Sequence, residues 1–229
     1  MSWNLCFSVA IAVAVSGAAH AAQGSYPAMA PLAQYASPDE AALARSAAPP
    51  SISKDAEVLV LGAHGYETAA KGANGFVCIV ERSWANDFAS PDFWNPRTRG
   101  PVCFNPASAR SVLPTYLQRT EWVLAGADRA QLLARTKAAV AAGRIRPPEA
   151  GAMCYMLSKG GYLGDEAGGH WRPHLMFFAP RDQAAAWGAN LPGSPVLGGE
   201  DGGVDPTIVF FVPVAAWSDG SPAEPMKMP

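Results

Sequence analysis

The chain has 229 residues, of which 49% are hydrophobic and 16% charged, and this composition excludes an intrinsically disordered protein because enough apolar surface is available for a core. Its 22 glycines and 21 prolines predict many turns, but the sequence has no G-X-Y period and is therefore not collagen-like. The 17 basic and 19 acidic side chains give a formal net charge of -2, so no net positive field attracts phosphate backbones, and nucleic acid is not expected as a partner.

The N-terminus has the features of a secretory signal peptide. An apolar stretch over residues 5–15 is followed by small residues, and Ala19-His20-Ala21 fits the A-x-A cleavage pattern. We therefore expect residues 1–21 to be a signal peptide and the mature protein to be periplasmic or secreted, with no transmembrane span. An uncleaved membrane anchor is the alternative, because residues 1–4 contain no lysine or arginine.

Residues 22–54 are expected to form a flexible lead-in with one short helix. Alanine, proline and polar residues alternate without a period over residues 22–36. Ser37-Pro38-Asp39-Glu40 then supplies an N-cap, a proline at the first helical position and the glutamate of a capping box. We expect this helix to reach about Ala47, before Pro49-Pro50 stops it.

Five apolar runs rich in β-branched and aromatic residues are predicted to be strands. They cover residues 58–61, 76–80, 152–158, 174–178 and 207–212. Asn74-Gly75 directly before the second run is typical of a two-residue hairpin turn, because a type I′ turn needs positive φ at both central positions. We therefore expect residues 66–73 to pair with residues 76–82.

The middle of the chain is predicted to contain a long loop and a helical hairpin. Residues 83–106 hold several prolines and aromatic side chains, which favours an ordered loop held in place by its rings. A first helix begins near Pro114 and ends at Gly126, and Asp128 with Gln131 caps a second helix that ends at Gly143.

The order of these elements lacks a regular β-α-β alternation, which disfavours a doubly wound parallel sheet. We predict a single α+β domain over residues 55–217, with a mainly antiparallel sheet of about five strands and the helical hairpin packed on one face. Residues 218–229 are expected to be a flexible tail.

The cysteines are interpreted through the expected export, because disulfides persist in oxidising compartments. Cys6 leaves with the signal peptide, so the mature chain keeps Cys78, Cys103 and Cys154. We expect a disulfide between Cys78 and Cys103, which would close the turn-rich loop and contribute roughly 3 kcal/mol through chain entropy. Cys154 lies in an apolar run, where a buried small hydrophobe is favoured over a reactive nucleophile.

Three segments resemble a family of uncharacterised exported bacterial proteins. They read N-G-F-V-C-I-V-E-R-S at residues 74–83, Y-M-L-S at 155–158 and P-H-L-M-F-F-A-P at 173–180. The likeness covers roughly residues 55–215, and a second cysteine in the family pattern supports the Cys78–Cys103 disulfide. The family has no known activity, so the resemblance implies no catalytic residues, and His64 and His170 lie outside its pattern.

Three histidines remain after signal removal: His64, His170 and His174. Beside Glu81 or Asp165 they would form a His₃ or His₂-carboxylate zinc site with an open position for water. The spacing argues against this site. Glycine and proline near His170 and His174 disfavour a helix, and in a strand four residues separate the two Cα atoms by about 13 Å. We therefore favour structural histidines and expect no cofactor, with zinc as the alternative.

Other patterns match known sites poorly. Ser51-Ile52-Ser53-Lys54 spells the S-x-x-K acylation motif, but it follows two prolines and precedes a strand. Ser158 and Lys159 are adjacent at a strand end and would point to opposite faces. The acidic segment 198–205 lacks the ligand pattern of an EF-hand, so a solvated turn is favoured over a calcium site.

The tryptophans lead to the functional hypothesis. Five of them fall in predicted loops, where aromatic side chains line ligand clefts or pin loops to the core: Trp84, Trp94, Trp171, Trp187 and Trp217. We expect a non-catalytic module of the cell envelope that binds a small-molecule or envelope ligand, or a partner, through these loops. The alternative is a metal-dependent hydrolase of an envelope or extracellular substrate that uses His170 and His174.

Overall fold

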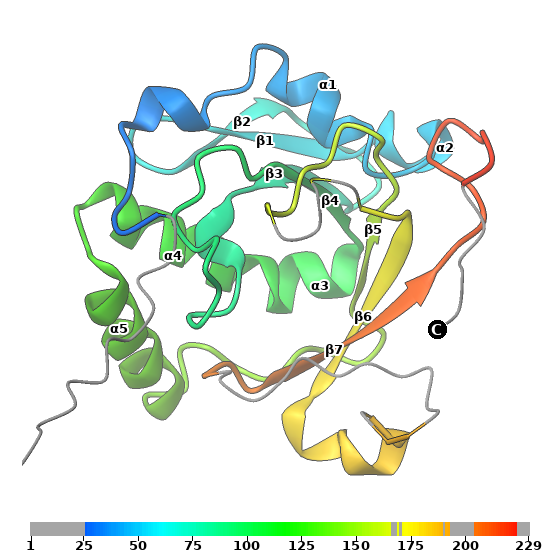
Figure 1. The fold of residues 1–229 in the computed structure, drawn as a ribbon. Helices are drawn as coiled ribbons and strands as arrows, with labels where there is room; N and C mark the ends of the chain where they lie inside the picture. Colours follow the sequence, from blue (N-terminus) through cyan, green and yellow to red (C-terminus); the bar gives the residue numbers. More distant parts are fainter. Residues whose placement is uncertain (1–25, 166–168, 170, 190, 193–203, 224–229) are drawn as a thin grey trace, which may run out of the picture.

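The computed structural model describes residues 26–165, 169, 171–189, 191–192 and 204–223 (Figure 1). The expected signal peptide, His170, most of the acidic segment 198–205 and the end of the expected tail lie outside these residues. No helix in the described part of the chain is long and apolar enough to cross a membrane.

The described residues form an α+β fold around one seven-stranded sheet. The strands are β1 Glu57–Leu61, β2 Tyr66–Ala70, β3 Val77–Glu81, β4 Gly100–Phe104, β5 Met153–Met156, β6 His174–Pro180 and β7 Thr207–Pro213. The helices are α1 Glu40–Arg45, α2 Pro50–Ser53, α3 Pro106–Ser111, α4 Leu113–Leu124 and α5 Arg129–Ala141. Short 3₁₀ turns cover Leu32–Tyr35, Ser83–Ala85, Arg181–Gln183 and Ala185–Trp187.

The strand order is β2-β1-β3-β4-β5-β6-β7, and every neighbouring pair is antiparallel except β1 with β3, which is parallel. The prediction of a mainly antiparallel sheet is therefore confirmed, but the sheet has two more strands than the five expected. The additional strands are β2 at one edge and β4 near the centre.

The expected hairpin across Asn74-Gly75 is wrong, because β2 pairs with β1 and β1 lies between β2 and β3. The segment after β2 instead crosses the start of β1, where the Ala73 amide donates to the Asp55 carbonyl. Backbone approach is close at this crossing: a Cβ built on Gly72 would lie 2.1 Å from the Glu57 nitrogen. The turn is present, since Gly75 has φ 78°, but it connects a crossover and not a hairpin.

Strand β4 lies where the sequence predicts loop. All five of its residues are buried, although Gly100 and Pro101 are unfavourable in strands. Pro101 is opposite Val80 of β3, whereas β4 pairs with β5 only at Cys103 and Phe104. Pro101 has no backbone N–H, and it lies in the part of β4 that does not pair with β5.

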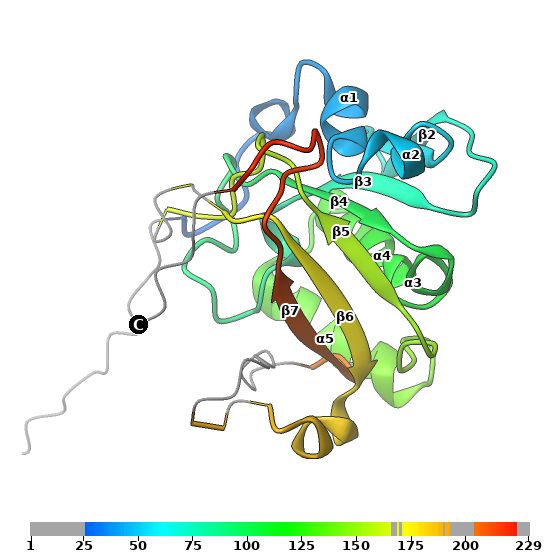
Figure 2. The same ribbon diagram turned by 90° about the vertical axis from the view of Figure 1, so that its right-hand side faces the viewer.

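Helices cover both faces of the sheet, and not one face as predicted. Figure 1 and Figure 2 show α1 on one side of β3 and β4, and α3 with α4 on the other. Because strand side chains alternate between faces, Ile79, Val102 and Phe104 pack toward α3 and α4. Cys78 and Cys103 point the other way, under α1.

The segment expected as a flexible lead-in is packed onto the sheet. Ala44 and Ala47 are fully buried in the same cluster as Val58 of β1. Asp39, and not Ser37, is the N-cap, because its side chain accepts from the Ala42 amide. The folded unit therefore begins N-terminal to residue 55.

A buried ion pair holds α1 in place. The Glu40 carboxylate accepts from the Leu61 amide at 2.8 Å and pairs with Arg82 at 2.5 Å, and Arg82 is only 1% exposed. Arg82 also donates to the Tyr35 carbonyl. Glu40 thus satisfies a strand amide and a guanidinium, which replaces the capping-box role predicted for it.

The disulfide between Cys78 and Cys103 is present, as predicted. The two residues are directly opposite each other on β3 and β4, with their Cα atoms 4.0 Å apart. Cys154 is a buried free cysteine. Burial raises the pKa of its thiol well above the ordinary value, so it is a protonated, inert side chain.

Candidate ligand-binding pocket

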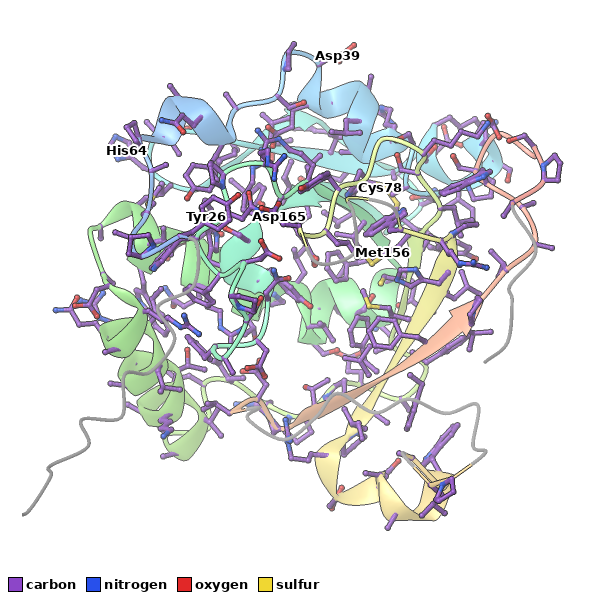
Figure 3. All side chains as sticks on the ribbon, in the orientation of Figure 1. Tyr26, Asp39, His64, Cys78, Met156 and Asp165 are labelled. Carbon is purple, nitrogen blue, oxygen red and sulfur yellow. A yellow bond between two sulfur atoms is a disulfide. The ribbon has the colours of Figure 1, made fainter. Side chains whose placement is uncertain are left out.

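The structure does not bring the two described histidines together. His64, labelled in Figure 3, lies in the turn between β1 and β2, whereas His174 begins β6. Three strands separate β1 from β6, which corresponds to about 19 Å at the usual strand spacing. His170 lies outside the described residues. Within the described ranges, no three His, Cys, Asp or Glu side chains form a group that would hold a metal ion.

His174 is packed between aromatic rings. Its ring centroid lies 5.3 Å from that of Trp171 and 5.4 Å from that of Phe211, and its Nδ1 is 2.7 Å from the Arg172 carbonyl. Burial lowers the pKa of this imidazole, so the neutral ring donates from Nδ1 to that carbonyl. Nε2 is buried without a hydrogen-bond partner.

The two carboxylates proposed as metal partners have opposite environments. The Glu81 carboxyl is buried, its Oε1 has no hydrogen-bond partner, and burial raises its pKa to about 8. Asp165 accepts from the hydroxyls of Tyr162 and Tyr26 and from Asn95 and Arg97. Those hydrogen bonds, that of Tyr162 first, lower the Asp165 pKa to about 2. Figure 3 shows Tyr26 and Asp165 side by side, so Asp165 joins the N-terminal segment to the fold.

The serine–lysine pairs form no catalytic dyad. Ser158 is buried and bonded to the Ser46 hydroxyl at 2.6 Å, while Lys159 pairs with Asp219 at 2.7 Å. Ser51 lies exposed in α2, a four-residue helix. Neither serine is placed against a lysine that would act as its base.

A cavity of about 180 Å³ lies between α4, strands β6 and β7, and the loop that follows β3. Its apolar lining consists mainly of Phe88, Val112, Tyr116, Phe178 and Val209. Its polar lining includes Asp87, Thr115, Arg119, Arg181, Asp205 and Thr207. Small-molecule sites combine apolar surface with polar groups that fix the orientation of the ligand, and this pocket offers both.

Helix α4 supplies part of the polar lining of this pocket. Thr115 and Arg119 are four residues apart on α4 and therefore lie on one face of the helix. Arg119 is 6% exposed, and its Nη2 lies 2.9 Å from both carboxylate oxygens of Asp205. The Phe88 ring stacks over this guanidinium with 4.8 Å to the ring centroid, and Arg119 Nε has no hydrogen-bond partner.

The far side of the pocket is held by Arg181 at the start of the turn after β6. Its Nε donates to the Asp205 carbonyl at 2.9 Å, which fixes the segment entering β7. Asp205 pairs with Arg119 and Asp87 accepts from the Ala89 amide, so both carboxylates are engaged as acceptors. The lining contains two guanidinium groups and two carboxylates, so its formal net charge is zero.

Sequence reasoning identified the aromatic loop but not the residues that matter in it. Trp84 and Trp94 are buried against Tyr35 and Leu132 and pin the loop to the fold. Phe88 of the same loop lines the pocket. The sequence favours a solvated turn at Asp205, and nothing in the local sequence indicates its pairing with Arg119, 86 residues earlier.

The remaining tryptophans lie elsewhere. Trp171 is buried in the main core, and Trp217 packs against the same core. Trp187 is 54% exposed and stacks on Phe210, with the ring centroids 4.8 Å apart.

Comparisons of this chain with protein-family models, with curated proteins and with solved structures found no match.

Proposed function

We propose that this protein is an exported, non-catalytic module of the cell envelope that binds a small ligand in the pocket formed by Phe88, Arg119, Phe178, Asp205 and Val209. The observation that carries the proposal is the ion pair of a buried Arg119 with a partly exposed Asp205 in the lining of this pocket. Export is supported by the signal-peptide features and by the Cys78–Cys103 disulfide, a bond typical of oxidising compartments.

The size and charge of the pocket define the ligand class. A cavity of roughly 150 Å³ accommodates a benzene molecule, so about 180 Å³ suits a ligand of one ring or a branched chain of similar volume. The apolar walls favour an uncharged ring, and Thr115, Thr207 and the guanidinium edges favour one hydrogen-bonding substituent. We infer a neutral or zwitterionic ligand, because the lining carries no net charge.

A fragment-binding experiment tests the proposal. A library of one-ring compounds with hydroxyl, amide or carboxylate substituents is screened against the mature protein by ligand-observed NMR. Val209→Phe fills the pocket from β7, whereas Val212→Phe adds the same volume at an exposed position whose side chain points to the opposite face of the same strand. We expect fragments that bind the wild type and the Val212 variant but not the Val209 variant. Equal binding by both variants would place the fragments outside the pocket and refute the proposal.

A further inference from the structure

A second hollow lies on the other side of the α3–α4 junction. This groove has a volume of about 680 Å³ and is bounded by the end of α3, the start of α4 and the end of α5. Its floor is formed by short or apolar side chains, among them Pro114, Ala139, Ala142 and Ile145. Figure 1 shows α5 beside α4. Ser111 and Thr115 line both hollows, so the groove adjoins the first pocket.

The rim of this groove is basic. Arg110, Arg144 and Arg146 line it, with Glu149 as the single acidic side chain among its lining residues. Arg110 Nη2 forms an ion pair with Glu149 Oε2 at 2.7 Å, and this hydrogen bond lowers the pKa of Glu149. Arg144 and Arg146 have no ion-pair partner among the described residues, so their two positive charges remain uncompensated.

The sequence around the groove reinforces this charge. Residues 129–148 contain five basic side chains and no aspartate or glutamate, although the whole chain has a net charge of -2. Arg135 lies seven residues, or about two helical turns, before Ala142 and so shares the groove side of α5. Arg146 Nε donates to the Gly143 carbonyl at 3.1 Å.

Exposed guanidinium groups at the edge of a groove match the chemistry of a phosphate group. A phosphomonoester carries a charge of about -1.5 to -2 near neutral pH and has three acceptor oxygens, whereas a carboxylate carries one charge. The planar fork of arginine binds phosphate oxygens in pairs, and the missing counter-charge at Arg144 and Arg146 is about the charge of one such group.

We propose that this groove binds a phosphomonoester or diphosphate group through Arg144 and Arg146, with Arg135 at its edge. Arg144 and Arg146 line the groove and not the pocket of the proposed function, so the inference does not depend on that function. The phosphate belongs to a free phosphorylated molecule or to the headgroup of an anionic lipid. Both present the same oxygens to the arginines, and they differ in whether binding needs a bilayer.

Titration calorimetry with inorganic pyrophosphate at low ionic strength tests the site directly. The groove variant Arg144→Gln/Arg146→Gln is compared with the control Lys71→Gln/Lys137→Gln. The control loses the same charge just after β2 and on the opposite side of α5. We expect pyrophosphate to bind the wild type and the control, and to bind the groove variant at least about tenfold more weakly, because two charge-assisted contacts are lost. Circular dichroism verifies that all variants are folded.

A second arm identifies the source of the phosphate. Phosphatidylcholine vesicles with and without phosphatidic acid are sedimented with each variant. If the protein sediments only with vesicles that contain phosphatidic acid, and the groove variant does not sediment, the groove binds a lipid headgroup. If the protein binds pyrophosphate but does not sediment with vesicles, the groove binds a free ligand. The proposal is overturned if neither probe binds, if the groove and control variants behave alike, or if citrate binds as tightly as pyrophosphate.

The same experiment separates this site from the first pocket. Val209→Phe fills the pocket on the β7 side and leaves the rim of the groove unchanged. We expect it to bind pyrophosphate like the wild type, so loss of fragment binding and loss of phosphate binding are independent results. A Val209 variant that loses pyrophosphate binding would contradict the assignment to the groove.

Discussion

Cys103 and Cys154 lie on neighbouring strands, yet their side chains are on opposite faces of the sheet. Cys103 is opposite Tyr155, so Cys154, one residue earlier, points toward α3 and α4 while Cys103 points toward α1. The free thiol therefore cannot attack the disulfide without loss of the strand pairing between them, which explains how one free cysteine is compatible with a stable bridge.

We predict that replacing Cys103 by Ala lowers the free energy of unfolding by about 2 to 5 kcal/mol, because the bridge restricts the unfolded chain. Urea denaturation measures this loss. Cys154→Ala is the matched control, since it removes a buried thiol and leaves the bridge intact, and non-reducing peptide mapping should find Cys78 joined to Cys103 in that variant. A bridge that includes Cys154 in the wild type would contradict the assignment.

Glu81 makes stability depend on pH. Its pKa in the folded state is about 8, raised by burial from 4.5, so the folded protein binds more protons than the unfolded chain between these values. The free energy of unfolding therefore falls as the pH rises from 4.5 to 8 and levels off above it. We predict that Glu81→Gln stabilises the protein at pH 7.5, on the order of a few kcal/mol, and has little effect at pH 4.

Chemical denaturation at several pH values tests the role of Glu81. Glu67→Gln on the edge strand β2 is the control, because it makes the same chemical change at an exposed position. The stability difference between wild type and Glu81→Gln should grow as the pH rises, and it should exceed that of Glu67→Gln at pH 7.5. Parallel pH profiles for both variants would show that Glu81 is ionised in the folded protein.

We predict that breaking the buried ion pair of Glu40 and Arg82 lowers the free energy of unfolding far more than breaking an exposed ion pair. Glu40→Ala leaves Arg82 buried without a counter-charge and frees the Leu61 amide, so we expect a loss of about 3 to 5 kcal/mol. Asp219→Ala removes the partner of Lys159, where both side chains are more than half exposed, and should cost less than about 1 kcal/mol. Thermal unfolding of the two variants compares them, and similar losses would contradict the buried position of α1.

His174 is predicted to have a structural role. His174→Gln retains a donor for the Arg172 carbonyl, so we expect a loss of no more than about 1 to 2 kcal/mol in a denaturant titration. Metal analysis of the purified protein should find no stoichiometric zinc before or after the substitution. Stoichiometric zinc that disappears in the variant would support the hydrolase alternative and His174 as a ligand.

The parts of the fold that are encoded locally were predictable. The pairing of Asp128 with Gln131 forms the expected capping box of α5, and the apolar runs at β1, β3, β5, β6 and β7 are strands. The parts decided by distant contacts were not. β4 contains Gly100 and Pro101 and is a strand because β3 pairs with it along its whole length, and Asn74-Gly75 has ordinary hairpin chemistry that the crossover overrides.

The candidate pocket shows the same limit. The predicted aromatic loop supplies Phe88, but the polar side depends on Arg119 meeting Asp205 across the fold. The sequence around a charged residue in a helix does not indicate which distant charged residue it will pair with. The histidines stand out as candidate metal ligands because the sequence contains only four of them. Their number does not indicate whether the fold brings them together.

The burial of both bridge sulfurs under α1 sets an order of events during maturation. Cys78 and Cys103 are fully buried, and Ala44 and Ala47 cover them. A protein oxidant must touch the thiols, so oxidation has to precede the docking of the N-terminal segment. Cys103 follows the end of α1 by more than fifty residues in the chain, so α1 is synthesised well before the bond is able to form and must stay undocked until then. If α1 docked before oxidation, the two thiols would be buried and a protein oxidant would have no access to them.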